Sequence, residues 1–162
     1  MADSAITLSQ FEASLAMLRE CIDKCPEPIW DEPVAKYPVW QVVYHTLCFV
    51  DCYLSPSNEE FRARADMHPK GMEELDAETP SRRFTRDEML RYTDICLQKM
   101  RGTIPNESDE VRAGPSGFSW LKFNRAEVHL YNMRHVQHHV GALGAILRRH
   151  GVELGWVKAG WR

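Results

Sequence analysis

Two histidines that lie four residues apart, His135 and His139, are the strongest indication of a metal site in this sequence. Residues four apart in an α-helix lie one turn apart on the same face, so both imidazoles can reach one metal ion. The helical zinc motif HExxH has the same spacing, but Val136 stands where that motif carries its glutamate base. His138 lies on the flank of the same face and is a competing ligand. The pattern predicts a helical metal site without a metalloprotease base.

The helix face that carries this pair is predicted to point into the core. Helical steps from His135 lead to a mostly apolar set of side chains: Val128, Tyr131, Asn132, Ala142 and Ile146. Imidazoles that are buried there need polar partners, and a metal ion supplies one.

A catalytic metal site of tetrahedral geometry needs a third protein ligand and one open position. His45 is the leading choice because it lies among apolar residues in the middle of another predicted helix. The alternative is that His45 is a core histidine hydrogen-bonded to a neighbour. Cys48, one turn away, can offer a thiolate, although packing as a small apolar residue is the simpler interpretation. Asp51 is a candidate for orienting a ligand.

The other histidines carry weaker signals. His129 and His150 are expected at the surface or at a helix end, where a protonated His150 suits the helix dipole. His68 lies in an irregular stretch and indicates nothing specific.

Four helices are expected to position these residues. Apolar residues recur every three or four positions, and prolines, glycines and capping-box spacings mark the ends. The predicted helices cover about residues 9–25, 38–54, 85–100 and 124–150. No sustained period-two alternation occurs, so no strand is expected.

The predicted fold class is therefore all-α: a four-helix bundle with long crossover connections, formed by residues 1–162 as a single domain. The longest connection, residues 56–83, is expected to be a partly helical surface crossover or a lid.

Composition excludes several classes of protein. A net charge of −3 without a basic stripe argues against nucleic-acid binding. No apolar segment is long enough to cross a membrane, and the first residues carry Asp3 and no basic residue, unlike a signal peptide. Five cysteines without a zinc-finger CxxC pair favour free thiols in a reducing cytoplasm.

A histidine in the middle of the second helix, followed near the end of the last helix by His-x-x-x-His-x-Gly, resembles the DinB/YfiT-like superfamily. The specific matches are His45, His135, His139 and Gly141, and the resemblance extends over residues 9–151. It implies a four-helix bundle that holds a divalent metal ion, zinc or nickel, with the three histidines. It also implies a homodimer and a small-molecule substrate.

Superfamily members with known activity include S-transferases and isomerases that use low-molecular-weight thiols, and others have been proposed as hydrolases. The resemblance therefore implies a metal-dependent enzyme that activates a thiol or a water molecule. Asp51 and Glu127 are candidate bases for a hydrolase. The alternatives are a non-catalytic metal- or ligand-binding module of a stress response, and a helical oligomer whose histidines are only packed or hydrogen-bonded.

Overall fold

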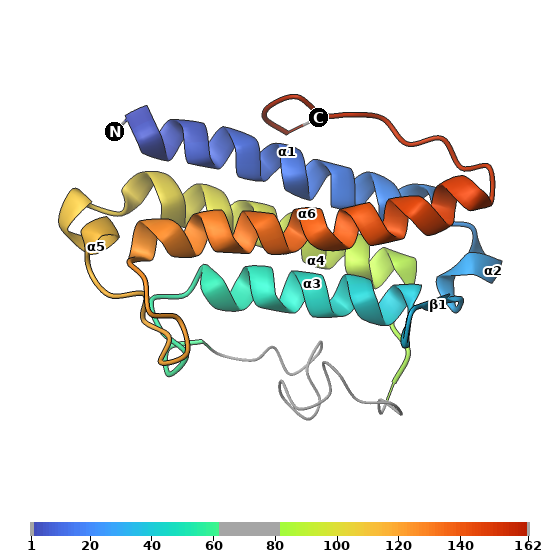
Figure 1. Cartoon of the computed structure of the whole chain (residues 1–162), viewed down its shortest axis with the longest axis horizontal. Helices are drawn as coiled ribbons and strands as arrows, with labels where there is room; N and C mark the ends of the chain where they lie inside the picture. The colour runs from blue at the N-terminus through green and yellow to red at the C-terminus, as the bar shows by residue number, and fades with distance from the viewer. Residues whose placement is uncertain (1, 62–81, 162) are drawn as a thin grey trace.

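The computed structural model describes residues 2–61 and 82–161, and these residues are mostly helical (Figure 1). The long helices of the described part are α1 (Ala2–Lys24), α3 (Val39–Tyr53), α4 (Arg86–Thr103) and α6 (Arg125–Arg149). Shorter elements lie between them: α2 (Glu27–Trp30), β1 (Pro33–Val34), β2 (Tyr37–Pro38), the 3-10 helix η2 (Ile104–Asn106) and α5 (Asp109–Ala113). The predicted all-α class is correct apart from the small sheet.

The long helices pack against one another around one core. In Figure 1, α6 lies between α1 and α3, and α4 lies behind α6. Both α6 and α4 pack against α1 and α3. Each long helix contributes fully or almost fully buried side chains, among them Leu15, Leu47, Met89 and Leu143.

The helix α3 is buried around nearly its whole circumference, as predicted for a central helix. His45 and Phe49 are its only residues that are not buried. These two side chains lie one turn apart, so they mark a single narrow stripe of α3 that reaches the surface.

The helix α1 begins earlier than predicted. Ser9 and Glu12 have the spacing of a capping box, but the helix starts at Ala2 and passes through Ser9 without a break. No proline or glycine stands between Ala2 and Lys24 to end a helix. The predicted start at residue 9 is wrong because a capping spacing marks a start only where the preceding residues are not helical.

The starts of the last two long helices are as predicted. Thr85 Oγ1 accepts from the backbone N–H of Glu88, and the Glu88 carboxylate accepts from the backbone N–H of Thr85. Asn124 Oδ1 accepts from the backbone N–H of Glu127 at the start of α6. Each cap satisfies a backbone donor that has no partner inside its helix.

The end of α6 is also as predicted. Gly151 has a φ of +77°, and its N–H donates to the carbonyl oxygen of Arg148. The N–H of Val152 donates to the carbonyl oxygen of Leu147. This left-handed turn at glycine is a common way for a helix to end.

A small hairpin between α2 and α3 was not expected. Pro33 pairs with Pro38 and Val34 pairs with Tyr37, with Ala35 at a φ of +57° in the turn. Strands of two residues are too short to show an alternating pattern, which is why the sequence did not predict them.

The loop between α5 and α6 packs closely on the end of α3. Gly117 has a φ of +85°, and a Cβ at this position would lie 1.8 Å from the carbonyl oxygen of Pro56. Arg125 donates to the carbonyl oxygens of Tyr53 and Ser55. These contacts join the end of α3 to the beginning of α6.

The C-terminal residues 152–161 run back along α1. The N–H of Gly160 donates to the carbonyl oxygen of Ser9, and the N–H of Gly155 donates to the carboxylate of Glu20. Trp161 packs on the core, whereas Trp156 is 70% exposed.

Of the predicted connection at residues 56–83, residues 62–81 lie outside the described residues. No described helix combines the length and the apolar character needed to span a membrane.

Candidate metal centre

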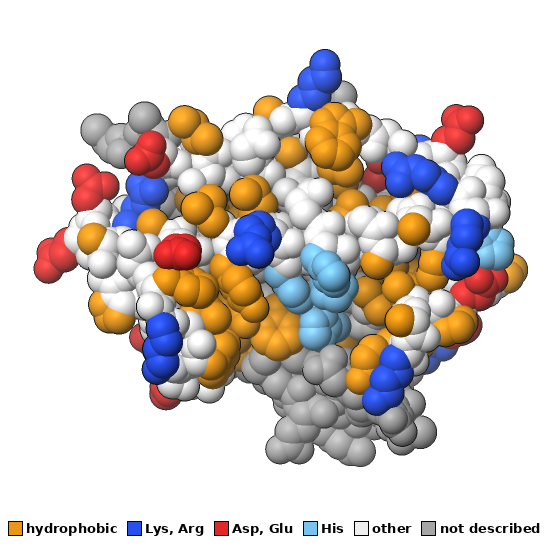
Figure 2. Space-filling model, viewed as in Figure 1, with side chains coloured by type: hydrophobic (Ala, Val, Ile, Leu, Met, Phe, Trp, Pro, Cys, Tyr) orange, Lys and Arg blue, Asp and Glu red, His pale blue; other side chains and the backbone are white. Residues whose placement is uncertain are grey.

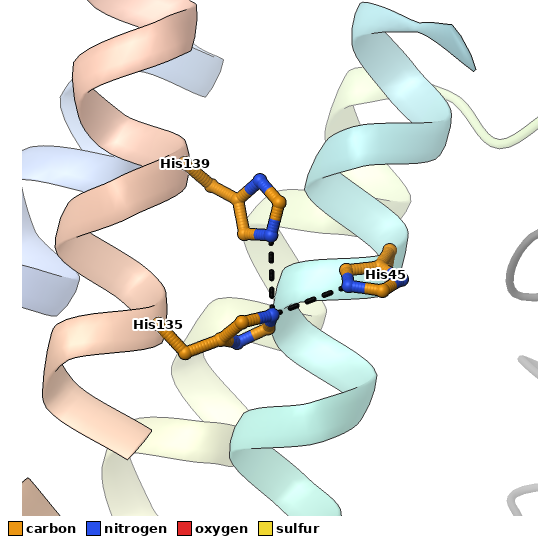
Figure 3. A group of neighbouring side chains, drawn as sticks. All are labelled: His45, His135 and His139. Carbon is orange, nitrogen blue, oxygen red and sulfur yellow. Dashed lines mark hydrogen bonds between the residues drawn. The ribbon is translucent and has the colours of Figure 1, made fainter. Parts of the chain in front are cut away.

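The three histidines predicted as ligands meet between α3 and α6 (Figure 3). The Nε2 atoms of His45 and His135, which are 90 positions apart in the chain, lie 3.2 Å from each other. The Nε2 atoms of His135 and His139 lie 3.1 Å apart. One potential ligand atom from each residue lies within 4.8 Å of the other two. Two distant stretches of sequence therefore present three nitrogens to one point.

Hydrogen bonds among the rings cannot account for the position of the His135 Nε2 between two other ring nitrogens. A neutral imidazole has one N–H donor and one nitrogen with a lone pair. The Nε2 of His135 lies close to the Nε2 of both His45 and His139. This nitrogen cannot donate to one neighbour and accept from the other, and as an acceptor it would share one lone pair between two donors. A cation between the rings accepts all three lone pairs.

The distances between the nitrogens fit a metal ion. Nitrogens about 2.1 Å from a tetrahedral zinc ion lie about 3.4 Å from one another. The observed separations of 3.2 and 3.1 Å are close to that value. All three side chains are half-buried. Figure 2 shows histidine side chains on the surface, beside a group of hydrophobic side chains.

Two of the three rings are held neutral. Burial, followed by the neighbouring imidazoles of His139, His45 and His138, lowers the pKa of His135 to about 3. Burial, followed by His45 and His138, lowers the pKa of His139 to about 4. Near pH 7 both rings are therefore in the form that binds metals.

Aromatic packing supports the histidine rings. The centroid of the Phe49 ring lies 4.9 Å from that of His45 and 5.5 Å from that of His135. The Nδ1 atom of His135 is buried and has no hydrogen-bond partner among the described residues. A carboxylate or carbonyl usually orients a metal-binding imidazole through that nitrogen. Phe49 is thus a site residue that the sequence reasoning missed, and its position one turn after His45 was the available signal.

The competing ligand candidates stand apart from the three histidines. His138 is exposed, with its ring centroid 5.0 Å from that of His139, and it is not part of the converging group. Cys48 is fully buried, and burial raises the pKa of its thiol far above the ordinary value. The structure therefore places Cys48 in the core as a protonated thiol, in line with the simpler interpretation.

Neither carboxylate considered as a base joins the histidines. Asp51 accepts from the Tyr92 hydroxyl at 3.0 Å and from Lys99 Nζ at 2.6 Å. The prediction that Asp51 orients a ligand is wrong, because a helical separation of six residues turns a side chain about 120° away from His45. Glu127 is exposed in the first turn of α6. Within residues 2–61 and 82–161, no Asp or Glu belongs to the group.

The surface position expected for His129 is also wrong. His129 is 1% exposed, and its Nε2 lies 2.7 Å from the carboxylate of Glu107. Arg125 donates to the same carboxylate. Glu107 comes from the preceding connection, so the helical pattern around His129 could not show this partner. His150 is exposed at the end of α6, as predicted, and lies 2.9 Å from the carboxylate of Glu32.

A separate hollow of about 640 Å³ is lined in part by Lys99, Glu107 and Arg125. These three residues already form ion pairs, Lys99 with Asp51 and Arg125 with Glu107. These charged side chains therefore already have partners within the protein. The three histidines are a stronger candidate for a binding site than this hollow.

No family model, curated protein or solved structure matches this chain in the comparisons with known proteins. The resemblance to the DinB/YfiT-like superfamily therefore stays a hypothesis, and a functional assignment has to be argued from the geometry of the three histidines.

Proposed function

We propose that this chain is a DinB-like four-helix bundle with long crossover connections, in which His45, His135 and His139 hold a divalent metal ion, zinc or nickel. The observation that carries the proposal is the convergence of three half-buried imidazole nitrogens, with the Nε2 of His135 close to the Nε2 of both His45 and His139. Three imidazoles suit zinc and nickel. The four long helices and their mutual packing support the bundle.

The proposed activity is the activation of a thiol or a water molecule for attack on a small-molecule substrate. A bound divalent cation lowers the pKa of a coordinated thiol or water, so that a nucleophile forms near neutral pH. The residues of the chain would hold the ion and orient the molecule bound to it. The helix α6 supplies two imidazoles from successive turns, and α3 supplies the third from the facing side.

Activation of a thiol, as in an S-transferase, is favoured over hydrolysis. A thiol has an ordinary pKa of about 8.5, so a modest lowering produces the thiolate without a protein base. Activation of water benefits from a carboxylate base. The described residues bring no carboxylate to the histidines, since Asp51 is paired with Lys99.

The missing carboxylate also favours a second function, a non-catalytic protein that binds a metal or a metal-bound ligand. Such a protein needs the three imidazoles but no group that moves a proton. It shares every structural feature of the site with the enzyme, so an activity measurement separates the two.

Metal content tests the proposed ligands. Protein purified without a metal-affinity column, incubated with zinc or nickel and desalted, is expected to retain about one ion per chain by mass spectrometry. His45→Ala, His135→Ala and His139→Ala should each lose most of this metal. His138→Ala is the matched control, because His138 is exposed beside the group without belonging to it. Metal content in His45→Ala equal to that of the unmodified protein would refute the site.

Turnover separates the two functions once metal is bound. The zinc-loaded and nickel-loaded proteins are assayed with low-molecular-weight thiols plus an alkylating electrophile, and separately with activated esters. Turnover that needs both thiol and metal supports the S-transferase, and ester cleavage that needs metal alone supports a hydrolase. One bound ion per chain without turnover in either assay supports the non-catalytic protein.

A further inference from the structure

Aromatic side chains extend from the three histidines in one direction along the contact between α3 and α6. We call them the aromatic strip: Phe49, Tyr53, Phe118, Trp120, Phe123 and Tyr131. In Figure 2, hydrophobic side chains lie directly beside the histidines on the surface. Phe49 supports two of the proposed ligands, but no residue of the strip belongs to the group of potential ligands. The position of the other aromatic rings therefore needs a separate explanation.

The strip begins in contact with the proposed ligands. The Phe49 ring lies against the rings of both His45 and His135, with centroid distances of 4.9 and 5.5 Å. Phe49 is half-buried, and it is the only residue of α3 besides His45 that is not buried. A ligand held at the three imidazoles therefore has the exposed part of an aromatic ring as its immediate neighbour.

The strip continues because α3 and α6 run in opposite directions (Figure 1). One turn beyond Phe49 on α3 is Tyr53, and one turn before His135 on α6 is Tyr131. The ring centroids of Tyr53 and Tyr131 lie 5.6 Å apart, and Phe49 lies 5.4 Å from Tyr53. In the other direction, the next turns carry Val42 and Ala142, which are not aromatic. The aromatic surface is thus on one side of the site.

The far end of the strip comes from the loop between α5 and α6. Phe118 and Trp120 pack with ring centroids 5.5 Å apart, and Trp120 Nε1 donates to the Tyr53 hydroxyl. Trp120 is 49% exposed, and Phe123, which packs on Tyr131, is half-buried. The strip therefore retains exposed apolar area along its length, from Phe49 beside the histidines to Trp120 at its far end.

From this geometry we infer that the molecule bound at the proposed metal site carries an aromatic group, which lies against Phe49 and Tyr131 while a donor atom binds the ion. The inference rests on the proposed function and adds the substrate class to it. Offset or edge-to-face packing on an aromatic wall favours a planar ring over a small polar group.

Two hydroxamates that share a metal-binding group test the inference. Acetohydroxamic acid carries a methyl group and benzohydroxamic acid carries a phenyl ring. With the zinc-loaded full chain, calorimetry is expected to show that the phenyl compound binds about tenfold more tightly, which corresponds to the packing energy of one aromatic ring with its buried area. Phe49→Ala should reduce this preference to about threefold or less.

Further variants keep the test decisive if Phe49→Ala disturbs the histidine rings. Tyr131→Ala removes a ring that packs on Tyr53 and Phe123, and it should also reduce the preference. Phe49→Leu keeps an apolar side chain without the aromatic ring and should reduce it partly. Trp156→Ala removes an exposed aromatic residue of the C-terminal tail, outside the strip, and should leave the preference unchanged.

The possible results distinguish the two proposals. One zinc ion per chain with equal affinities for both hydroxamates would overturn the aromatic substrate class and leave the metal site standing. An unchanged preference in both Phe49→Ala and Tyr131→Ala would also overturn it. Failure of the unmodified protein to retain zinc would overturn the metal site, and this inference with it.

Discussion

At the scale of single residues, the candidate centre depends on imidazoles that stay neutral although they lie side by side. A protonated His135 would lose most of its hydration and would repel the rings of His139 and His45, which is why its pKa falls to about 3. Neutrality keeps the lone pairs available to a cation. The same property makes the stability of the metal-free protein depend on pH.

The metal-free protein is expected to lose stability as the pH falls from about 7.5 to about 5. His135 titrates at an ordinary pKa of 6.5 in the unfolded chain and at about 3 in the fold. As the pH falls below 6.5, the unfolded chain takes up a proton that the folded chain does not, so the free energy of unfolding decreases. The contribution of His135 over this range is on the order of 1 to 2 kcal/mol. Urea unfolding in the presence of EDTA at both pH values measures it.

Two variants connect this pH dependence to the ring. His135→Gln should reduce the difference between the two pH values, whatever its effect on stability at either one. His150→Gln changes an exposed histidine at the end of α6 and serves as the control. The same pH dependence in His135→Gln and in the unmodified chain would mean that another group is responsible.

At the scale of secondary-structure elements, the contacts between the end of α3 and the beginning of α6 hold the two halves of the site opposite each other. Arg125 is buried, donates to the carbonyl oxygens of Tyr53 and Ser55, and pairs with Glu107. A cation at the carboxyl end of a helix also interacts favourably with the helix dipole. These contacts, together with the loop that carries Gly117, support the register in which His45 faces α6.

Gly117→Ala is expected to destabilise the protein by roughly 2 kcal/mol or more. The φ of +85° disfavours any residue with a Cβ, and that Cβ would lie 1.8 Å from the backbone oxygen of Pro56. Backbone atoms on both sides must move apart to relieve the clash. Thermal or urea unfolding of the variant measures the loss.

Gly102→Ala is the matched control for this prediction. Gly102 lies in α4, and a Cβ there would have no heavy atom within 4 Å. Alanine is favoured over glycine in a helix by up to about 1 kcal/mol, so this change should be neutral or stabilising. Equal losses of stability in the two variants would contradict the role assigned to the Gly117 turn.

At the scale of the whole molecule, a metal ion at the three histidines would join helices that are far apart in the chain. His45 and His135 are separated by 90 positions, and unfolding would separate them. Any ion that binds only the folded protein shifts the folding equilibrium by mass action. Metal binding and global stability are therefore linked, although the site involves only α3 and α6.

Zinc is expected to raise the Tm of the protein, and EDTA is expected to lower it. At a free zinc concentration one hundred times the Kd, the added stability is about 3 kcal/mol. Scanning fluorimetry across a zinc titration measures the shift. In His45→Ala the shift should disappear, whereas in His138→Ala it should be retained. A zinc-dependent Tm in His45→Ala equal to that of the unmodified protein would place the ion elsewhere.

Features that depend on residues close together in the chain could be predicted from the local sequence pattern. The spacing of His135 and His139, the caps at Thr85 and Asn124, and the left-handed end at Gly151 were all predicted. Helical period and capping involve residues only a few positions apart, so a local pattern contains them. The early start of α1 and the hairpin of β1 and β2 were missed. A local capping pattern does not show whether a helix continues through it, and strands of two residues are too short to show alternation.

Contacts between side chains of different helices could be seen only once the helices were packed together. Whether His45 faces His135, Asp51 turns toward Lys99, and Phe49 lies against two imidazoles depends on how α3 rotates against its neighbours. That rotation is set by the combined packing of all the core side chains and by contacts such as Arg125 with the end of α3. No local stretch of sequence contains these distances, since the partners come from helices joined by long connections.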